Sequence, residues 1–228
     1  MVTVYRSDHP VAGLILAHGA GGGQQSSFMV RAARDLAERG ITVATFDFPY
    51  MAQGRGVPDK PPVLEAHWRT ILAEVHGHSA FEGLPLFIGG KSMGGRIASQ
   101  VAAAGVDHVA GLVFFGYPLH PPGRPQQRRD AHLPGIAAPM LFIQGTRDQF
   151  GTSAEIAELL PRLHGRAALF EVADGDHSFK TRVKVTGRKP DAAIVDVIDA
   201  AAAFMRHPAD DAGAPPGQVP SKGTAPPR

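Results

Sequence analysis

The chain has 228 residues, 43% of them hydrophobic, which suits one α/β domain with a sizeable core better than two domains. Its formal net charge is only +2 and its basic residues are mostly scattered, so the sequence does not indicate a nucleic-acid-binding surface. It contains no cysteine, which excludes disulfides, thiolate catalysis and thiolate metal sites.

The N-terminal segment, residues 1–10, lacks the charged and apolar regions of a signal peptide. No apolar run approaches the length of a membrane span. We therefore expect a soluble cytoplasmic protein with neither a nucleic-acid nor a membrane partner, and of undetermined oligomeric state.

In the first part of the chain, apolar strand-like runs alternate with helical patterns. Residues 11–17 predict a buried strand, and residues 26–39 predict a helix that a serine caps and Gly40 ends. The next strand is predicted over residues 41–46. A helix follows, because apolar residues recur there at helical spacing: Leu64, Trp68, Ile71, Leu72 and Val75.

The middle of the chain continues the alternation. Residues 84–88 predict a strand and residues 95–104 predict the helix that follows it. Two more strands are predicted over residues 109–115 and 140–143. The segment between them has room for a loop and one short helix over 126–132, which is too little for a cap domain.

The last elements follow the same rule. Residues 152–155 resemble a capping box before a helix that reaches about Leu160, and residues 167–172 predict the final strand. The basic stretch 180–189 is interpreted as a solvated loop, with a contact to an anionic substrate as the alternative. The last helix has Pro190 near its start and an apolar stripe: Ile194, Val197, Ile198, Ala201 and Met205.

This alternation predicts a mostly parallel central sheet with helices on both faces. The strands are near-continuous apolar runs, as sheets covered on both sides require. One domain is therefore expected over residues 1–206. Residues 207–228 are rich in Pro, Gly and Ala and lack aromatic residues, so we expect them to form a disordered tail.

The segment Gly90-Lys91-Ser92-Met93-Gly94 has the form G-x-S-x-G between a predicted strand and a predicted helix. This is the context of a nucleophile elbow, in which a tight turn pushes the serine hydroxyl out of the sheet. A chain with 27 glycines can also produce the pattern by accident, as an ordinary turn. A Walker A phosphate loop is excluded, because it requires glycine at position 85, where this chain has proline.

Three further polar clusters follow predicted strands, where sites form in open parallel sheets. The glycine-rich segment 18–23 is a candidate oxyanion loop, in which the backbone N–H of Ala20 and that of Met93 would face a carbonyl oxygen. Asp148 is the candidate orienting acid, because Thr152 or Ser153 is better placed than Asp148 to cap the next helix.

His177 follows the final predicted strand in a glycine-containing loop and is the candidate general base. The order Ser92, Asp148, His177 is the order expected of α/β-hydrolases. In this chemistry the histidine takes the serine proton and returns it to the leaving group, while the aspartate holds the histidine tautomer. No cofactor or metal is required.

The segments Gly90–Gly95 and Gly116–Gly123 carry a family resemblance. Over residues 11–206 the chain looks like an α/β-hydrolase, a single-domain α/β fold with a minimal cap or none, in the small branch near dienelactone hydrolases. The two segments are similar to a hydrolase-like family named after an NSL histone-acetyltransferase complex subunit and a testis-expressed protein. Dienelactone hydrolases use a cysteine nucleophile, which this chain lacks, so their lactone substrate is not expected.

The resemblance assigns the triad roles to Ser92, Asp148 and His177 and the oxyanion roles to Ala20 and Met93. It implies a serine hydrolase acting on small ester or thioester substrates. The alternatives are a non-catalytic member that serves as an interaction scaffold, as some members of the family do, and an acyltransferase.

Four other polar residues lie in or near these segments, and three of them have two interpretations. His120 and Arg124 are candidate substrate contacts or parts of a proline-stiffened surface turn. Asp47 is assigned to a turn, and Lys91 is expected to be solvated or to sit beside the pocket.

Overall fold

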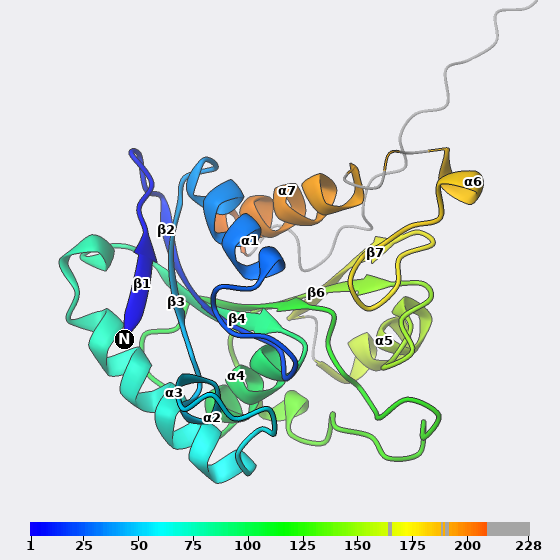
Figure 1. The fold of residues 1–228 in the computed structure, drawn as a ribbon, viewed down its shortest axis with the longest axis horizontal. Helices are drawn as coiled ribbons and strands as arrows, with labels where there is room; N and C mark the ends of the chain where they lie inside the picture. The colour runs from blue at the N-terminus through cyan, green and yellow to red at the C-terminus, as the bar shows by residue number, and fades with distance from the viewer. Residues whose placement is uncertain (164–165, 188, 190–191, 209–228) are drawn as a thin grey trace, which may run out of the picture.

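The computed structural model describes residues 1–163, 166–187, 189 and 192–208. Of the predicted tail, residues 207–228, the part from Ala209 on lies outside the described residues, as does Pro190 at the start of the last predicted helix. Figure 1 shows a central sheet with helices on both faces.

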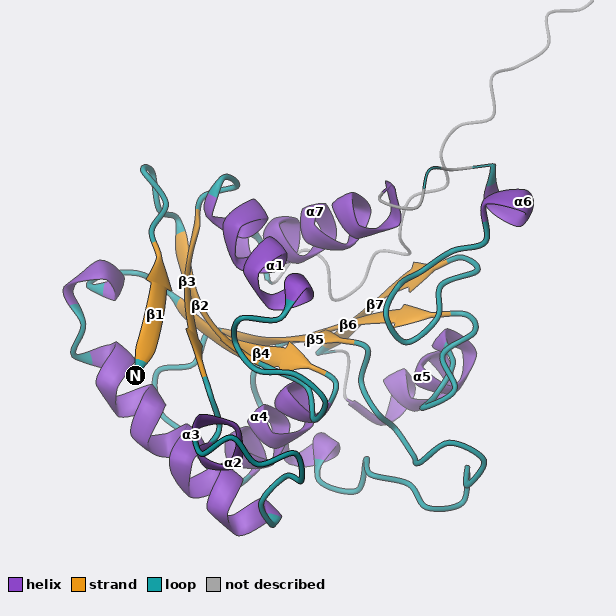
Figure 2. Ribbon diagram, viewed as in Figure 1, coloured by secondary structure: helices purple, strands orange, loops and turns teal. Residues whose placement is uncertain are grey.

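The sheet has seven strands in the order β1-β3-β2-β4-β5-β6-β7 (Figure 2). They are β1 (Val2–Tyr5), β2 (Ala12–Ala17), β3 (Ile41–Phe46), β4 (Leu86–Lys91), β5 (Gly111–Phe115), β6 (Met140–Gly145) and β7 (Ala167–Val172). Every neighbouring pair is parallel except β1, which runs antiparallel to β3 at the edge. The predicted fold class, a mostly parallel α/β sheet, is confirmed.

Helices cover both faces of the sheet. On one face lie α1 (Ser27–Ala37) and α7 (Ala192–Arg206), and on the other lie α3 (Pro61–His76) and α4 (Met93–Ala103) (Figure 1). The remaining helical elements are α2 (Pro49–Ala52), α5 (Ser153–Leu159), α6 (Val183–Thr186) and the 3-10 turns η1 (Ser79–Phe81), η2 (Leu133–Gly135) and η3 (Leu160–Leu163).

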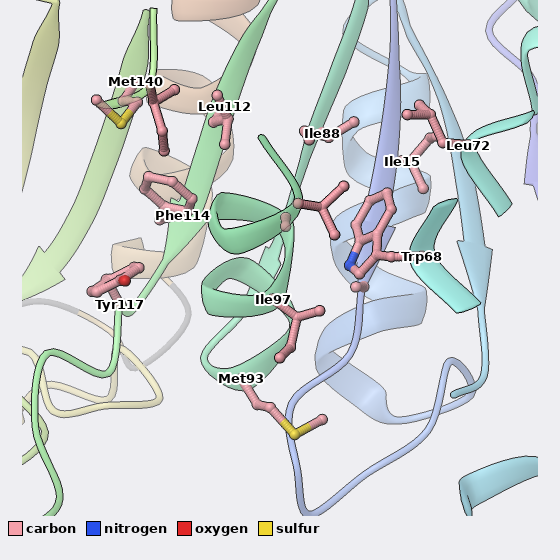
Figure 3. Packing of buried hydrophobic residues seen from close by; sticks show 14 of the residues in the cluster. Ile15, Trp68, Leu72, Ile88, Met93, Ile97, Leu112, Phe114, Tyr117 and Met140 are labelled. Atoms are coloured by element: carbon pink, nitrogen blue, oxygen red, sulfur yellow. The ribbon is translucent and has the colours of Figure 1, made fainter. Parts of the chain in front are cut away.

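The sheet separates two apolar cores. Along β2, Leu14 and Leu16 belong to the core under α1 and α7, whereas Ile15 belongs to the core under α3 and α4. This is the alternation that the pleat of a strand imposes. Figure 3 shows the second core, where Trp68 and Ile97 are gathered against the sheet.

The predicted short helix over residues 126–132 is wrong, because the segment is a loop that ends in η2. The backbone groups of Arg129 form hydrogen bonds with Leu119 and Tyr117 instead of with residues of the same helical turn. The N–H of Arg129 donates to Leu119 O at 2.8 Å, and Tyr117 Oη donates to Arg129 O at 2.8 Å. The stretch predicted as a loop over 180–189 includes the short helix α6.

Candidate active site

Ser92 sits at the junction of β4 and α4 with φ 51° and ψ −116°. Such a conformation is costly for a non-glycine residue and persists only where its surroundings enforce it. Gly90 and Gly94 allow it: a Cβ at Gly94 would lie 2.7 Å from His18 O, and one at Gly90 would lie 2.7 Å from Gly94 C. The backbone therefore turns as the elbow interpretation expects.

The side chains of the three predicted triad residues lie in one hydrogen-bonded line. Ser92 Oγ is 2.8 Å from His177 Nε2, and His177 Nδ1 is 2.7 Å from Asp148 Oδ2. The three residues come from the ends of β4, β6 and β7, which are brought to one edge because these strands are parallel.

Asp148 is 1% exposed and is held from both sides. The N–H of Phe150 donates to its Oδ1 at 2.8 Å, and Gln144 Nε2 donates to its Oδ2 at 2.9 Å. Gln144 is fully buried at the end of β6 and also accepts from the N–H of Tyr117 at 2.8 Å. One amide thus fixes both the carboxylate and the chain that leaves β5.

The loop that carries His177 is fastened to the elbow. Lys91 Nζ donates a hydrogen bond to the backbone carbonyl of His177 and lies 5.1 Å from the centre of the Phe179 ring. Burial of this ammonium lowers the pKa of Lys91 to about 8. The ring of Phe150 packs on the imidazole of His177 with centroids 4.3 Å apart, so both the backbone and the ring of His177 are held.

The glycine-rich segment after β2 is shaped by the buried side chain of His18. Its Nδ1 lies 2.7 Å from Gly19 O, and its Nε2 accepts from the N–H of Phe48 at 3.1 Å. Since a carbonyl oxygen only accepts, Nδ1 carries the proton and the ring is neutral. This agrees with the lowered pKa of His18, whose main cause is burial.

The two predicted oxyanion donors lie on the wall of the same cavity as Ser92. Met93 is the first residue of α4, so its N–H has no partner within the helix. Within the described structure, the N–H of Ala20 donates to no other residue, while Tyr50 Oη donates to Ala20 O at 3.0 Å. Both N–H groups are available to a ligand.

The cavity has a volume of about 600 Å³, and Ser92 and His177 lie on its wall. Such a volume is in the usual range of roughly 300–1,000 Å³ for small-molecule sites. Apolar side chains contribute part of the wall, among them Phe28, Met29 and Leu64. The cavity beside the serine is thus large enough for a small molecule.

Residues 10–206 match the family described as the Alpha/beta hydrolase domain. The chain belongs to this family. The match lies within the predicted domain over residues 1–206.

One curated relative and several solved structures are similar to this α/β-hydrolase. Human monoglyceride lipase is 33% identical over 109 residues, which cover 46% of this chain and only 35% of that protein. An alpha-beta serine hydrolase homologue from Coxiella burnetii has a TM-score of 0.66 at 17% identity, covering 90% of this chain and 89% of that one. Dienelactone hydrolase from Anabaena variabilis has a TM-score of 0.69 at 20% identity, with 90% of each chain covered.

His120 and Arg124, predicted as substrate contacts in the α/β-hydrolase, are not among the described residues that line the cavity. His120 is 6% exposed, and its ring is used internally: Nε2 lies 3.1 Å from Glu155 Oε1 and Nδ1 lies 2.9 Å from Pro121 O. Arg124 is exposed on the same loop. The alternative interpretation, a proline-stiffened turn, describes both better.

Several residues that shape this site were not predicted. Gln144 and Tyr50 are buried polar side chains whose partners lie far away in the sequence. The only signal for Gln144 was a polar residue at the end of an apolar strand. Asp47, assigned to a turn, also accepts from the N–H of Gln24 at 2.7 Å and so anchors the end of the glycine-rich segment.

Neither a membrane span nor a metal-binding cluster is present in the described part of the chain. None of its helices is long and apolar enough to cross a membrane. In the same residues no three His, Asp or Glu side chains converge in a way that would hold a metal ion.

Proposed function

We propose that this α/β-hydrolase is a serine hydrolase that cleaves small ester or thioester substrates through an acyl-enzyme on Ser92. The observation that carries the proposal is the continuous line Ser92–His177–Asp148, with 2.8 Å and 2.7 Å between the bonded atoms. A nucleophile within reach of a base that is itself held by a third group is the arrangement this chemistry needs.

In the proposed first half-reaction, His177 Nε2 takes the Ser92 proton as Oγ attacks the carbonyl carbon. The electrons of the C=O bond move to its oxygen, and the N–H groups of Ala20 and Met93 stabilise the charge that forms there. When the C=O bond re-forms, the bond to the alcohol or thiol breaks, and His177 gives its proton to the leaving group.

In the second half-reaction, water takes the place of the serine hydroxyl. His177 removes its proton, the water oxygen attacks the acyl carbon, and Ser92 leaves with the proton that His177 returns. Asp148 keeps the proton on Nδ1 throughout, so that Nε2 faces Ser92 as a base. Its two further hydrogen-bond donors hold it in position for this role.

The finer family resemblance is part of the proposal. The segments Gly90–Gly95 and Gly116–Gly123 support a place near the NSL-subunit and testis-expressed hydrolase-like family. In that family a non-catalytic scaffold is the alternative function for this chain. A scaffold has no use for a serine in a costly conformation aligned with a held histidine, which favours catalysis.

The decisive experiment is labelling with a fluorophosphonate probe together with hydrolysis of 4-nitrophenyl butyrate. We expect the wild type to be labelled at Ser92. Ser92→Ala should abolish labelling and lower kcat by roughly 10⁴-fold or more, and His177→Ala should be nearly as damaging, since the two residues act as a unit. Labelling of Ser92→Ala equal to that of the wild type would overturn the assignment.

The acid is tested by a matched set of aspartate variants. Asp148→Asn should keep the fold, because an amide fills the same volume, yet should lose on the order of 10³–10⁴-fold in kcat because the imidazole tautomer is no longer enforced. Asp174→Asn and Asp176→Asn, in the loop that carries His177, should retain most of the activity. If one of these abolishes turnover while Asp148→Asn does not, the acid is misassigned.

A further inference from the structure

Three cationic side chains line the cavity beside Ser92: Lys91, Arg96 and Arg129. The Lys91 ammonium is already engaged with the His177 carbonyl. The two arginines have no part in the proposed acyl transfer, and their surroundings differ from those of ordinary surface arginines.

Arg96 lies one turn after Ser92 on α4, so the two side chains project from the same side of the helix. Its Nη1 donates to Gln100 Oε1 at 3.3 Å, but its Nε is buried and has no partner. Burial, and after it the nearby charge of Arg129, lowers the pKa of Arg96. Arg96 is half-buried, and a cation that is partly withdrawn from water without a counter-charge is less stable, so a bound anion would offset part of that cost.

Arg129 is held through hydrogen bonds of its backbone, whereas its side chain has no hydrogen-bond partner among the described residues. Its N–H and C=O are both bonded across the loop, to Leu119 and Tyr117. The nearby carboxylate of Asp130 is taken by other arginines, with Arg128 Nη2 at 2.7 Å and Arg162 Nη1 at 3.5 Å. Within the described structure, the guanidinium of Arg129 has neither a hydrogen bond nor an ion pair.

Acidic groups on the cavity wall do not balance these charges. Asp59 is the only carboxylate among the described lining residues, and its Oδ1 is paired with Arg55 Nη2 at 2.7 Å. No described carboxylate lies within 4.0 Å of a guanidinium nitrogen of Arg96 or Arg129, although Glu65 contributes to the field at Arg96. The wall beside the serine therefore carries uncompensated positive charge.

We propose that Arg96 and Arg129 form a carboxylate subsite, so that the substrate is an ester whose distal end is a carboxylate. The proposal rests on the proposed function and specifies its substrate class. Guanidinium groups bind carboxylates through paired, charge-assisted hydrogen bonds, and both arginines line the cavity that holds Ser92. Because Arg96 is about 6 Å along the helix axis from Ser92, the carboxylate lies several bonds from the carbonyl that Ser92 attacks.

The test compares two matched ester pairs, one for each side of the scissile bond. On the acyl side, mono-4-nitrophenyl glutarate is compared with 4-nitrophenyl 5-methylhexanoate, in which an isopropyl group replaces the carboxylate. On the alcohol side, 4-butanoyloxybenzoate is compared with 4-butanoyloxybenzamide. For each pair, the ratio of kcat/KM for the anionic ester to kcat/KM for the neutral ester is measured, after subtraction of spontaneous hydrolysis.

We expect the wild type to prefer the anionic member of at least one pair by about tenfold or more, which is the scale of a charge-assisted hydrogen bond. Arg129→Gln should lower that ratio by about tenfold, and Arg129→Lys should retain part of it. Arg124→Gln, which removes an exposed arginine of the same loop outside the cavity, should keep the wild-type ratio. No anionic preference in either pair, or a wild-type ratio in Arg129→Gln, overturns the proposal.

A binding measurement separates this proposal from the proposed function. Calorimetry of Ser92→Ala with monobutyl glutarate should show saturable binding that weakens at least tenfold in Ser92→Ala/Arg129→Gln. If this binding is found while the wild type hydrolyses no ester, the subsite is supported and the hydrolase proposal is overturned. Hydrolysis of neutral esters, with no binding of monobutyl glutarate and no anionic preference, sinks the subsite alone.

Discussion

Lys91 shows how one side chain links two loops of the site. It precedes Ser92 in the elbow and reaches the backbone of His177, far along the chain. Gly116 makes room for it: its φ is 70°, and a Cβ there would lie 3.0 Å from Lys91 Nζ. Lys91 is half-buried rather than fully solvated, and it lies on the cavity wall, in line with the other expectation, a place beside the pocket.

Lys91 makes the free energy of unfolding depend on pH. Burial lowers its pKa in the folded state from 10.5 to about 8, so between these values the unfolded chain holds a proton that the folded chain has released. Rising pH therefore stabilises the folded state through this group. Between pH 7.5 and pH 10, we expect the wild type to gain on the order of 2–3 kcal/mol relative to Lys91→Met.

The measurement is urea denaturation of both proteins at the two pH values. Lys184→Met, which alters an exposed lysine of α6, serves as the control and should follow the wild type at both. An identical pH response in the wild type and in Lys91→Met would show that the Lys91 ammonium is not desolvated on folding.

At the scale of elements, the β4–α4 junction depends on close backbone contact with the end of β2. A Cβ at Gly94 would lie 2.6 Å from Ala17 C and 2.7 Å from His18 O, which are backbone atoms that cannot rotate away. The same contact sets the distance between the elbow and the glycine-rich segment, which carry the two proposed oxyanion donors. The glycine is thus needed for space rather than for a positive φ.

Gly94→Ala should destabilise the protein by about 1–3 kcal/mol, as overpacking does in a filled core. Helix propensity alone predicts the opposite sign, because alanine is favoured over glycine by about 1 kcal/mol within a helix. Thermal unfolding shows whether Gly94→Ala lowers or raises the stability of the folded protein. Gly135→Ala, at a helical-turn glycine with open space around its Cβ position, is the matched control and should unfold close to the wild type. Equal stability of the two variants would refute the steric argument.

At the scale of the whole molecule, the short segment between β5 and β6 limits how much of a substrate the site can enclose. The chain between β5 and β6 forms a loop whose one described regular element is the 3-10 turn η2. The cavity at the strand ends therefore has no helical cap built from this segment. Acyl groups that outgrow it remain in contact with water and contribute little binding free energy.

We therefore expect kcat/KM for 4-nitrophenyl esters to be highest at acetate or butyrate and to have fallen by octanoate. Each CH₂ left unburied forgoes about 0.8 kcal/mol. The measurement is a series from acetate to palmitate, each ester held below its solubility limit. A value that rises steadily to palmitate would instead indicate a long apolar groove.

The sequence by itself predicted the six parallel strands β2 to β7 and the main helices between them, the elbow at Ser92 and the choice of Asp148 and His177 as its partners. These follow from local patterns, because parallel strands bring their carboxyl ends to one edge wherever they are in the chain. The side chains of the three residues lie within hydrogen-bond distance, and their catalytic roles stay predictions.

Only the tertiary structure decided what surrounds those residues. The edge strand β1 pairs with β3 across the chain, Gln144 holds Asp148, Lys91 fastens the His177 loop, and Arg96 lies beside Arg129 without a counter-charge. His120 contacts Glu155 and is not among the described residues that line the cavity. Each of these depends on a partner that is distant in sequence, and the burial that gives such a contact its strength exists only once the chain has folded.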